Sequence, residues 1–123
     1  GLGHDTQLLD EFVHARALRT PGVFFSDDEC ASLNDSRKSL QRLAGTFAAK
    51  EAFYKAYPVH TMFYWTDIEI THNTHGRPTF HLRGAVEKVF QEHQWSAHLS
   101  ISHSGDYASA VVLILQTRGR DVI

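Results

Sequence analysis

The sequence contains one cysteine, Cys30, and only three prolines among its 123 residues. A single cysteine excludes a disulfide within the chain and fits a reducing compartment, so we expect a cytoplasmic protein. No apolar run reaches the length of a membrane span, and the longest, Ala108–Leu115, is interrupted by Ser109. No secretory signal is visible, although a start at Gly1 leaves open a leader that has been removed.

A strong charge of either sign is also missing. The formal net charge is -2, which lacks the basic excess of general nucleic-acid binders but allows a local basic patch for an acidic partner. Repeats, low-complexity tracts and linkers are absent as well, while 42% of the residues are hydrophobic, enough to form a core. We therefore expect a single domain over residues 1–123.

The hydrophobic pattern predicts an α+β fold, with an antiparallel sheet packed against a long helix and shorter helices. The long helix is expected at Arg37–Ala56, and Pro58 follows its end. Ser26–Glu29 has the spacing of a capping box and predicts a helix start, while Thr6 is expected to cap a helix over Gln7–Arg16. The remaining elements are strands at Gly1–Asp5, Tyr64–Thr71, Thr79–Leu82, Ser96–Ser102 and Tyr107–Leu115, and a helix at Gly84–Gln94.

Two charged residues within the long helix are candidates for chemistry. Glu51 and Lys55 are four residues apart, so they share a helix face, next to the small residues Ala44, Ala48 and Ala52. Spacing alone favours a surface ion pair, which is common and weak. The small neighbours instead favour a partly buried site, in which the carboxylate and the ammonium group hold a metal ion and a phosphate.

The beginning of the chain offers a second carboxylate. Gly1 and Gly3 permit close approach of the backbone to another element, and Asp5 follows them. Alone, an aspartate in this place usually caps a helix. Together with Glu51, however, Asp5 supplies two oxygen ligands, and magnesium typically takes one or two carboxylates, several waters and phosphate oxygens.

Two turns carry further polar groups. Ser100–Ser104 ends a strand with hydroxyls and an imidazole, a pattern that fits a site and ordinary turn polarity equally well. Gly76–Pro78 has the composition of a hairpin turn, but its Arg77 can also hold a phosphate through the planar guanidinium group. The chain has nine histidines, and a metal-binding protein built on them stays open as a rival hypothesis, although no Cys/His set matches a zinc site.

Taken together and in order, these segments resemble the holo-acyl-carrier-protein synthase family of 4′-phosphopantetheinyl transferases. The resemblance covers most of the chain, and the helix sequence Phe-Ala-Ala-Lys-Glu-Ala with the strand end Ser-Ile-Ser-His is its specific part. The matching segments are Gly1–Asp5, Leu43–Ala56, Trp65–Ile70, Gly76–Pro78, Ser100–Ser104 and Tyr107–Ala110.

The resemblance implies an enzyme that moves 4′-phosphopantetheine from coenzyme A to a serine of an apo-acyl or peptidyl carrier protein, with Mg²⁺, and releases 3′,5′-ADP. Asp5 and Glu51 are then the expected magnesium ligands, and Lys55 contacts the diphosphate of coenzyme A. These three are the expected catalytic residues, with Glu51, directly or through a metal-bound water, as the base for the serine proton. The resemblance also implies nucleotide contacts from Gly76, Arg77, Pro78, Ser102, His103 and Ser104.

The same resemblance implies a homotrimer in which each active site lies between two subunits, one supplying the Gly-x-Asp strand and the other part of the long helix. An acidic carrier would dock on Arg16 and Arg19. Many relatives have arginine where this chain has Thr46, and we expect Arg42 or Lys50 to compensate. Nucleic acid and membrane are not expected as partners.

In one rival interpretation, the chain has the same fold but catalyses no reaction. The chain would then be a non-catalytic domain within a larger synthase that binds coenzyme A or acts as a scaffold. The complete set of Asp5, Glu51 and Lys55 argues against this interpretation. The sequence leaves open whether the carrier belongs to fatty-acid, polyketide or peptide synthesis, and whether the chain is a free-standing enzyme or a domain of a larger one.

Overall fold

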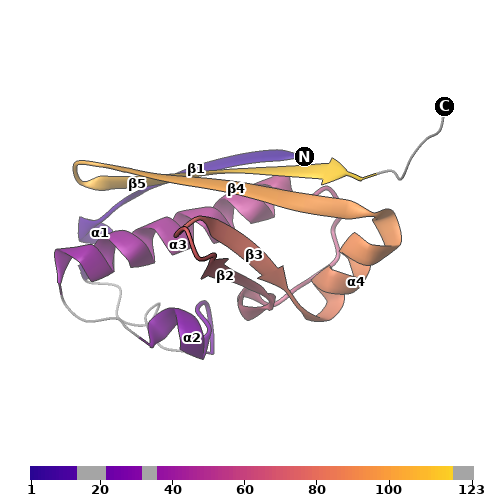
Figure 1. The fold of residues 1–123 in the computed structure, drawn as a ribbon, viewed down its shortest axis with the longest axis horizontal. Helices are drawn as coiled ribbons and strands as arrows, with labels where there is room; N and C mark the ends of the chain where they lie inside the picture. The colour runs from indigo at the N-terminus through magenta and orange to yellow at the C-terminus, as the bar shows by residue number, and fades with distance from the viewer. Residues whose placement is uncertain (14–21, 32–35, 118–123) are drawn as a thin grey trace.

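The computed structural model describes residues 1–13, 22–31 and 36–117. The two arginines predicted to bind the carrier, Arg16 and Arg19, lie outside the described residues. Figure 1 shows a long sheet lying along α3, with a hairpin and α4 beside it. In chain order the elements are β1 (Leu2–Leu8), α1 (Asp10–Val13), α2 (Asp27–Cys30), α3 (Arg37–Ala56), the 3₁₀ helix η2 (Trp65–Asp67), β2 (Ile68–His72), β3 (Pro78–Leu82), α4 (Gly84–His93), β4 (Trp95–Ser104) and β5 (Tyr107–Gln116).

The main sheet has three antiparallel strands in the order β1-β5-β4, and β2 and β3 form a separate antiparallel hairpin. Along the central strand β5, buried and more exposed residues alternate, as expected of a sheet with one covered face. Its buried side chains are Ala108, Ala110, Val112 and Ile114. They pack against α3, so the predicted α+β fold, an antiparallel sheet against a long helix, is confirmed.

The long helix α3 has the predicted bounds. The Ser36 hydroxyl accepts a hydrogen bond from the backbone N–H of Ser39, 3.2 Å away, which satisfies a donor of the first turn. Beyond Ala56, Tyr57 has extended backbone angles and Pro58 follows, so the helix ends there. Small residues on the buried face allow the sheet to approach closely. They are Ala44, Ala48, Ala49, Ala52 and Ala56.

Gly1 and Gly3 explain how β1 approaches α3. A Cβ atom at Gly3 would lie 1.9 Å from the carbonyl oxygen of Ala52, and one at Gly1 would lie 1.9 Å from that of Ala56. Any side chain at these positions would therefore push the strand away from the helix. The two glycines were predicted to permit close approach, and the structure confirms this. They hold the part of β1 that precedes Asp5 directly against α3.

Two predicted element boundaries are wrong. Thr6 does not cap a helix, because β1 continues to Leu8 and Thr6 pairs with Ser109 of β5; the next helix begins only at Asp10. Pairing with β5 satisfies the backbone groups of this segment, which outweighs the local capping preference. The predicted strand from Tyr64 also starts later, because a 3₁₀ turn, with Asp67 N–H donating to the carbonyl oxygen of Tyr64 at 2.9 Å, precedes β2.

Candidate active site

Asp5 and Lys55, predicted from separate motifs, meet where β1 crosses α3. The Nζ atom of Lys55 donates to Asp5 Oδ1 at 3.0 Å and to the carbonyl oxygen of His4 at 3.0 Å. The second carboxylate oxygen of Asp5 accepts from Nε2 of Gln7 at 2.6 Å. The Asp5 side chain is 11% exposed and that of Lys55 is 51% exposed. The aspartate is thus held in place, while about half of the Lys55 side chain stays exposed.

Glu51 belongs to the same cluster. Burial raises the pKa of its carboxyl group, the negative charge of Asp5 raises it further, and the positive charge of Lys55 partly opposes both effects. The electrostatic coupling to Asp5 and Lys55 places the three groups in one neighbourhood on the β1 side of α3. Two carboxylates and one ammonium group carry a net negative charge, so the cluster can bind a further cation.

The donor set of this cluster fits magnesium. Two carboxylates, with water and phosphate completing the shell, are typical of Mg²⁺, which prefers oxygen ligands. Zinc would need three or four ligands that include nitrogen or sulfur. In the described ranges, no group of three or more His, Cys, Asp or Glu residues is arranged so that it could hold a metal ion.

A second part of the predicted site lies around a cavity of about 320 Å³ between α3, β4 and the β2–β3 turn. Gly76, Pro78 and His103, predicted as nucleotide contacts, line this cavity. Gly45 gives His103 room, since a Cβ atom there would lie 3.0 Å from Nε2 of the imidazole. That Nε2 atom lies 2.9 Å from the carbonyl oxygen of Gln41, to which it can only donate.

The cavity is lined by basic and polar groups from α3 and β2, and by no carboxylate of the described residues. Burial lowers the pKa of His72, and the positive charge of Arg42 lowers it further, so His72 is neutral and Arg42 carries the charge. Sequence reasoning missed Gln41 and His72 as site residues. Lys38, Arg42 and Gly45 follow each other at helical spacing, so the pattern could have indicated one face of α3. The basic lining suits an anionic ligand such as a phosphate.

Three of the predicted nucleotide contacts do not line this cavity. Arg77 lines a neighbouring shallow cavity together with Ser100, although the turn that carries it is fixed, because the Asn73 side-chain oxygen accepts from the backbone N–H of Arg77 at 2.9 Å. Ser102 and Ser104 alternate with His103 along β4, so their side chains point to the opposite face of the sheet. Their role stays a prediction.

The two parts of the site lie on opposite sides of α3. Asp5 on edge strand β1 pairs with Ala110, which in turn pairs with Ile101 on the other edge strand, β4. Lys55 contacts the β1 edge, whereas Gly45 of the same helix faces Ile101 and His103. Within one chain, the carboxylate cluster and the basic cavity are therefore separated by the width of the sheet.

Comparison with known proteins decides the family. The sequence matches the 4′-phosphopantetheinyl transferase superfamily over residues 1–112. The holo-[acyl-carrier-protein] synthase of Streptomyces avermitilis is 38% identical over 119 residues, which cover 92% of this chain and 94% of that protein. The chain belongs to the 4′-phosphopantetheinyl transferase superfamily.

Solved structures of this superfamily have the same fold. The holo-[acyl-carrier-protein] synthase of Neisseria meningitidis superposes with a TM-score of 0.80 at 27% identity, over 94% of this chain and 98% of that one. The ACPS–CoA complex of Chronobacterium ammoniagenes gives 0.76 at 31% identity, over 96% and 98% of the two chains. The predicted family, fold and transferase class are thus confirmed. Over the described ranges, no helix is long and apolar enough to cross a membrane.

One expectation for this superfamily member is wrong. Lys50 cannot replace a phosphate-binding arginine, because its side chain is fully buried and its Nζ atom is already bound. It donates to Glu29 Oε1 at 2.7 Å and to the carbonyl oxygens of Phe24 at 2.7 Å and Trp65 at 3.0 Å. Arg42, which lines the basic cavity, is the remaining candidate for the contact that Thr46 lacks.

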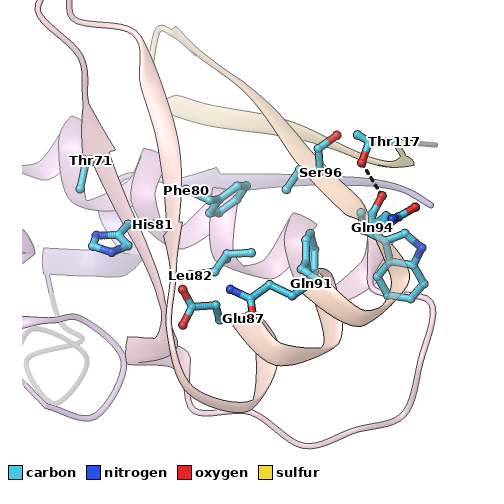
Figure 2. A pocket seen from close by; sticks show the side chains of 12 residues that line it. Thr71, Phe80, His81, Leu82, Glu87, Gln91, Gln94, Ser96 and Thr117 are labelled. Carbon is cyan, nitrogen blue, oxygen red and sulfur yellow. Dashed lines mark hydrogen bonds between the residues drawn. The ribbon is translucent and has the colours of Figure 1, made fainter. Parts of the chain in front are cut away.

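A wider hollow lies away from all of these residues. Figure 2 shows it between β3, α4 and β4. Its volume is about 720 Å³. Phe80 and Leu82 form part of its apolar floor, and Glu87 and Gln91 project from α4 at its side. Of the predicted site residues that the structure describes, none lines it. The volume of a cavity therefore does not by itself identify the candidate active site of this superfamily member.

Proposed function

We propose that the chain transfers the 4′-phosphopantetheine group of coenzyme A to a serine of an apo-acyl or peptidyl carrier protein, with Mg²⁺, and releases 3′,5′-ADP. The observation that carries this proposal is the cluster of Asp5, Glu51 and Lys55, two carboxylates and an ammonium group in contact or electrostatically coupled. The similarity to holo-[acyl-carrier-protein] synthases, one of them in complex with CoA, supports it.

The three residues have distinct roles in this proposal. Asp5 and Glu51 hold the Mg²⁺ ion, which supplies positive charge to the diphosphate oxygens when it is bound. Glu51, directly or through a metal-bound water, would also take the proton from the serine hydroxyl. Lys55 balances the charge on the bridging oxygen that leaves with 3′,5′-ADP, and its half-exposed side chain can reach a ligand.

The basic cavity on the other side of α3 would bind the adenosine 3′-phosphate part of coenzyme A. We assign this role to Gly76, Arg77 and Pro78 on the β2–β3 turn, with Arg42 in place of the arginine that many relatives have at position 46. Ser102, His103 and Ser104 are the further nucleotide contacts in this proposal. The predominance of basic groups around the cavity supports an anionic ligand.

A homotrimer would join the two parts of the site. Because the carboxylate cluster and the basic cavity lie at opposite edges of one sheet, the β1 edge of one subunit must meet the cavity of another to form a complete site. The outer face of the sheet supports such an assembly, since it exposes large apolar side chains. They are Leu2 at 67%, Val111 at 41%, Leu113 at 38% and Leu115 at 45% exposure.

The carrier protein would dock on Arg16 and Arg19 through its acidic surface, so its KM should rise with ionic strength. A cytoplasmic location and a single domain over residues 1–123 remain part of the proposal.

Mass spectrometry tests the reaction directly. A purified apo-acyl carrier protein is incubated with the chain, coenzyme A and Mg²⁺, with and without EDTA. We expect the carrier to gain the mass of one phosphopantetheine group, and the gain to disappear with EDTA. If several carriers gain nothing although coenzyme A binds, the chain is a non-catalytic domain of the same fold.

The Glu51→Gln variant tests the assignment of the base. It should lose most of the turnover and keep the fold, because glutamine has nearly the same shape but cannot take the proton. Circular dichroism checks that the fold is retained. Wild-type turnover in this variant would remove Glu51 from the mechanism.

A further inference from the structure

Gln7 is a polar residue of β1 that none of the roles above uses. It lies two positions after Asp5, and because side chains alternate along a strand, both residues point to the same face of the sheet. Gln7 pairs with Ala108 of β5, a buried residue that packs against α3. The half-buried Gln7 side chain is therefore directed to the helix side of the sheet, where the carboxylate cluster lies.

The amide group of Gln7 contacts Asp5 directly. Its Nε2 atom donates to Asp5 Oδ2 at 2.6 Å, in a partly buried position. A carboxylate only accepts hydrogen bonds, so the NH₂ end of the amide has to face it. A hydrogen bond to an ionised acceptor is about twice as strong as one between neutral groups. The bond from Gln7 therefore fixes the position of Oδ2.

Gln7 and Lys55 hold the two oxygens of Asp5 from different elements. Lys55 donates to Oδ1 at 3.0 Å from α3, and Gln7 donates to Oδ2 from β1. With one hydrogen bond on each oxygen, the carboxylate is restrained from rotating about its own bond. Each oxygen has two lone pairs, so each keeps one for a further ligand. The carboxylate is thus held in one orientation and can still bind Mg²⁺.

Two properties distinguish the bond from Gln7 from the bond from Lys55. The amide carries no charge, so it holds Asp5 without reducing the net negative charge of the cluster. It also stays beside Asp5 when Lys55 contacts a phosphate, because Asp5 and Gln7 belong to the same strand. The Lys55 side chain is half exposed, and in the proposed function it serves the substrate. Gln7 is therefore the contact of Asp5 that does not depend on the substrate.

We propose that Gln7 is a positioning residue that orients the Asp5 carboxylate for Mg²⁺ and so sets the affinity of the site for this ion. The inference rests on the proposed function, in which Asp5 and Glu51 hold the ion, and it adds a residue that acts through Asp5. Hydrogen-bond partners of metal ligands typically contribute a factor of about 10–100 to metal affinity or activity. We expect Gln7 to act on the affinity for Mg²⁺, with little effect on the rate at saturating Mg²⁺.

Two variants remove the hydrogen bond in different ways. Gln7→Met keeps the length of the side chain but has no donor. Gln7→Asn keeps the amide, but it is shorter by about 1.5 Å, so its donor would lie about 4 Å from Oδ2, beyond hydrogen-bond distance. The matched control is Gln91→Met, the same exchange on α4 in the separate hollow of Figure 2. Circular dichroism checks that each variant is folded.

Binding of Mn²⁺, measured by electron paramagnetic resonance with coenzyme A present and the carrier absent, reports metal affinity without turnover. Mn²⁺ is the probe because carboxylate and water ligands suit it as they suit Mg²⁺. Gln7→Met and Gln7→Asn should weaken Mn²⁺ binding about tenfold, and Gln91→Met should leave it unchanged. Asp5→Ala removes the ligand itself and should weaken the binding further.

Transfer assays at increasing Mg²⁺ give a second readout. The Mg²⁺ concentration at half-maximal rate should rise about tenfold in both Gln7 variants, while kcat at saturating Mg²⁺ stays close to that of the wild type. A merely structural role would lower the amount of folded protein, and excess Mg²⁺ would then not restore the rate.

The outcomes separate this proposal from the proposed function. Wild-type Mn²⁺ affinity in both Gln7 variants, together with a loss in Asp5→Ala, would refute the role of Gln7 alone. Loss of the fold in both Gln7 variants would make the residue structural and refute that role as well. Unchanged Mn²⁺ binding in Asp5→Ala would instead refute the metal ligands of the proposed function, and the role of Gln7 with them.

Discussion

Lys50 and Lys55 lie five positions apart on α3, yet their surroundings differ completely. The Lys50 side chain has no exposed surface and its Nζ atom donates to three oxygens, those of Glu29, Phe24 and Trp65. The Lys55 side chain is half exposed, and its Nζ atom donates to Asp5 and to a backbone carbonyl of β1. Five residues turn an α-helix by about 140°, which takes one lysine into the core and leaves the other at its edge.

The difference separates a cation enclosed in the fold from one that is open to a ligand. Burial lowers the pKa of Lys50, and the charge of Glu29 opposes this, so the ion pair offsets the cost of burying the ammonium group. All hydrogen-bonding capacity of Lys50 is used within the fold. Lys55 has an ion pair on one side and solvent on the other, which suits a residue that must meet a substrate phosphate.

The largest expected effect is on stability, in Lys50→Met. The carboxylate of Glu29, of which only 4% is exposed, would remain buried without its cation, and the free energy of unfolding should fall by about 3–5 kcal/mol. Urea denaturation measures this. In the double variant Lys50→Met/Glu29→Gln part of the loss should be recovered, since no charge is left unpaired. The recovery is incomplete because the backbone N–H groups of Ser26 and Ile70 both donate to the Glu29 carboxylate, and a glutamine has only one acceptor oxygen. A loss below about 1 kcal/mol in the single variant would contradict the comparison.

Lys55→Met should show the reverse pattern. The exposed partner of an ion pair contributes little, so stability should change by about 1 kcal/mol or less. The value of kcat/KM for coenzyme A should nevertheless fall by a factor of about 10²–10³, as expected when a charge that stabilises the transition state is lost. Steady-state transfer assays beside urea denaturation separate the two effects. A drop in stability as large as that of Lys50→Met would make Lys55 structural as well.

The Gly3→Ala variant tests the contact between Asp5 and Lys55 from β1, the strand that carries Asp5. The added methyl group would collide with the carbonyl oxygen of Ala52 and move β1 away from α3, at a cost of about 1–3 kcal/mol. The Asp5–Lys55 contact depends on this approach, so transfer activity should fall along with stability. Lys88→Ala, on an exposed position of α4, is the control and should change neither quantity. Unchanged activity in Gly3→Ala would show that Asp5 does not need the close approach.

The smallest effect is expected at the exposed ion pair of Arg37 and Asp106, whose side chains are 59% and 62% exposed. Arg37→Ala should lower the free energy of unfolding by about 0–1 kcal/mol, and less at high salt, because solvent and ions screen the pair. Denaturation at two salt concentrations tests this. A loss comparable to that of Lys50→Met would mean that burial does not decide the strength of ion pairs in this fold.

Much of the fold could be predicted because the signals were local. The hydrophobic pattern and Pro58 marked α3, and the Ser26–Glu29 capping box was found as expected. The errors at Thr6 and Tyr64 came from positions where a distant strand or a local 3₁₀ turn competed with the propensity of the segment. The burial of Lys50 was also not predicted. Helical spacing shows which residues share a face, but it does not tell which face packs against the core.

The sequence by itself determined the elements, the family and the types of side chain that could carry chemistry, because spacing along a helix and glycine before Asp5 are local properties. Only the tertiary structure decided which of these side chains meet. It brought Asp5 to Lys55 across 50 positions of sequence, buried Lys50, and placed His103 and Gly76 at the opposite edge of the sheet. Strand pairing and burial are set by contacts between distant segments, and no local pattern encodes their outcome.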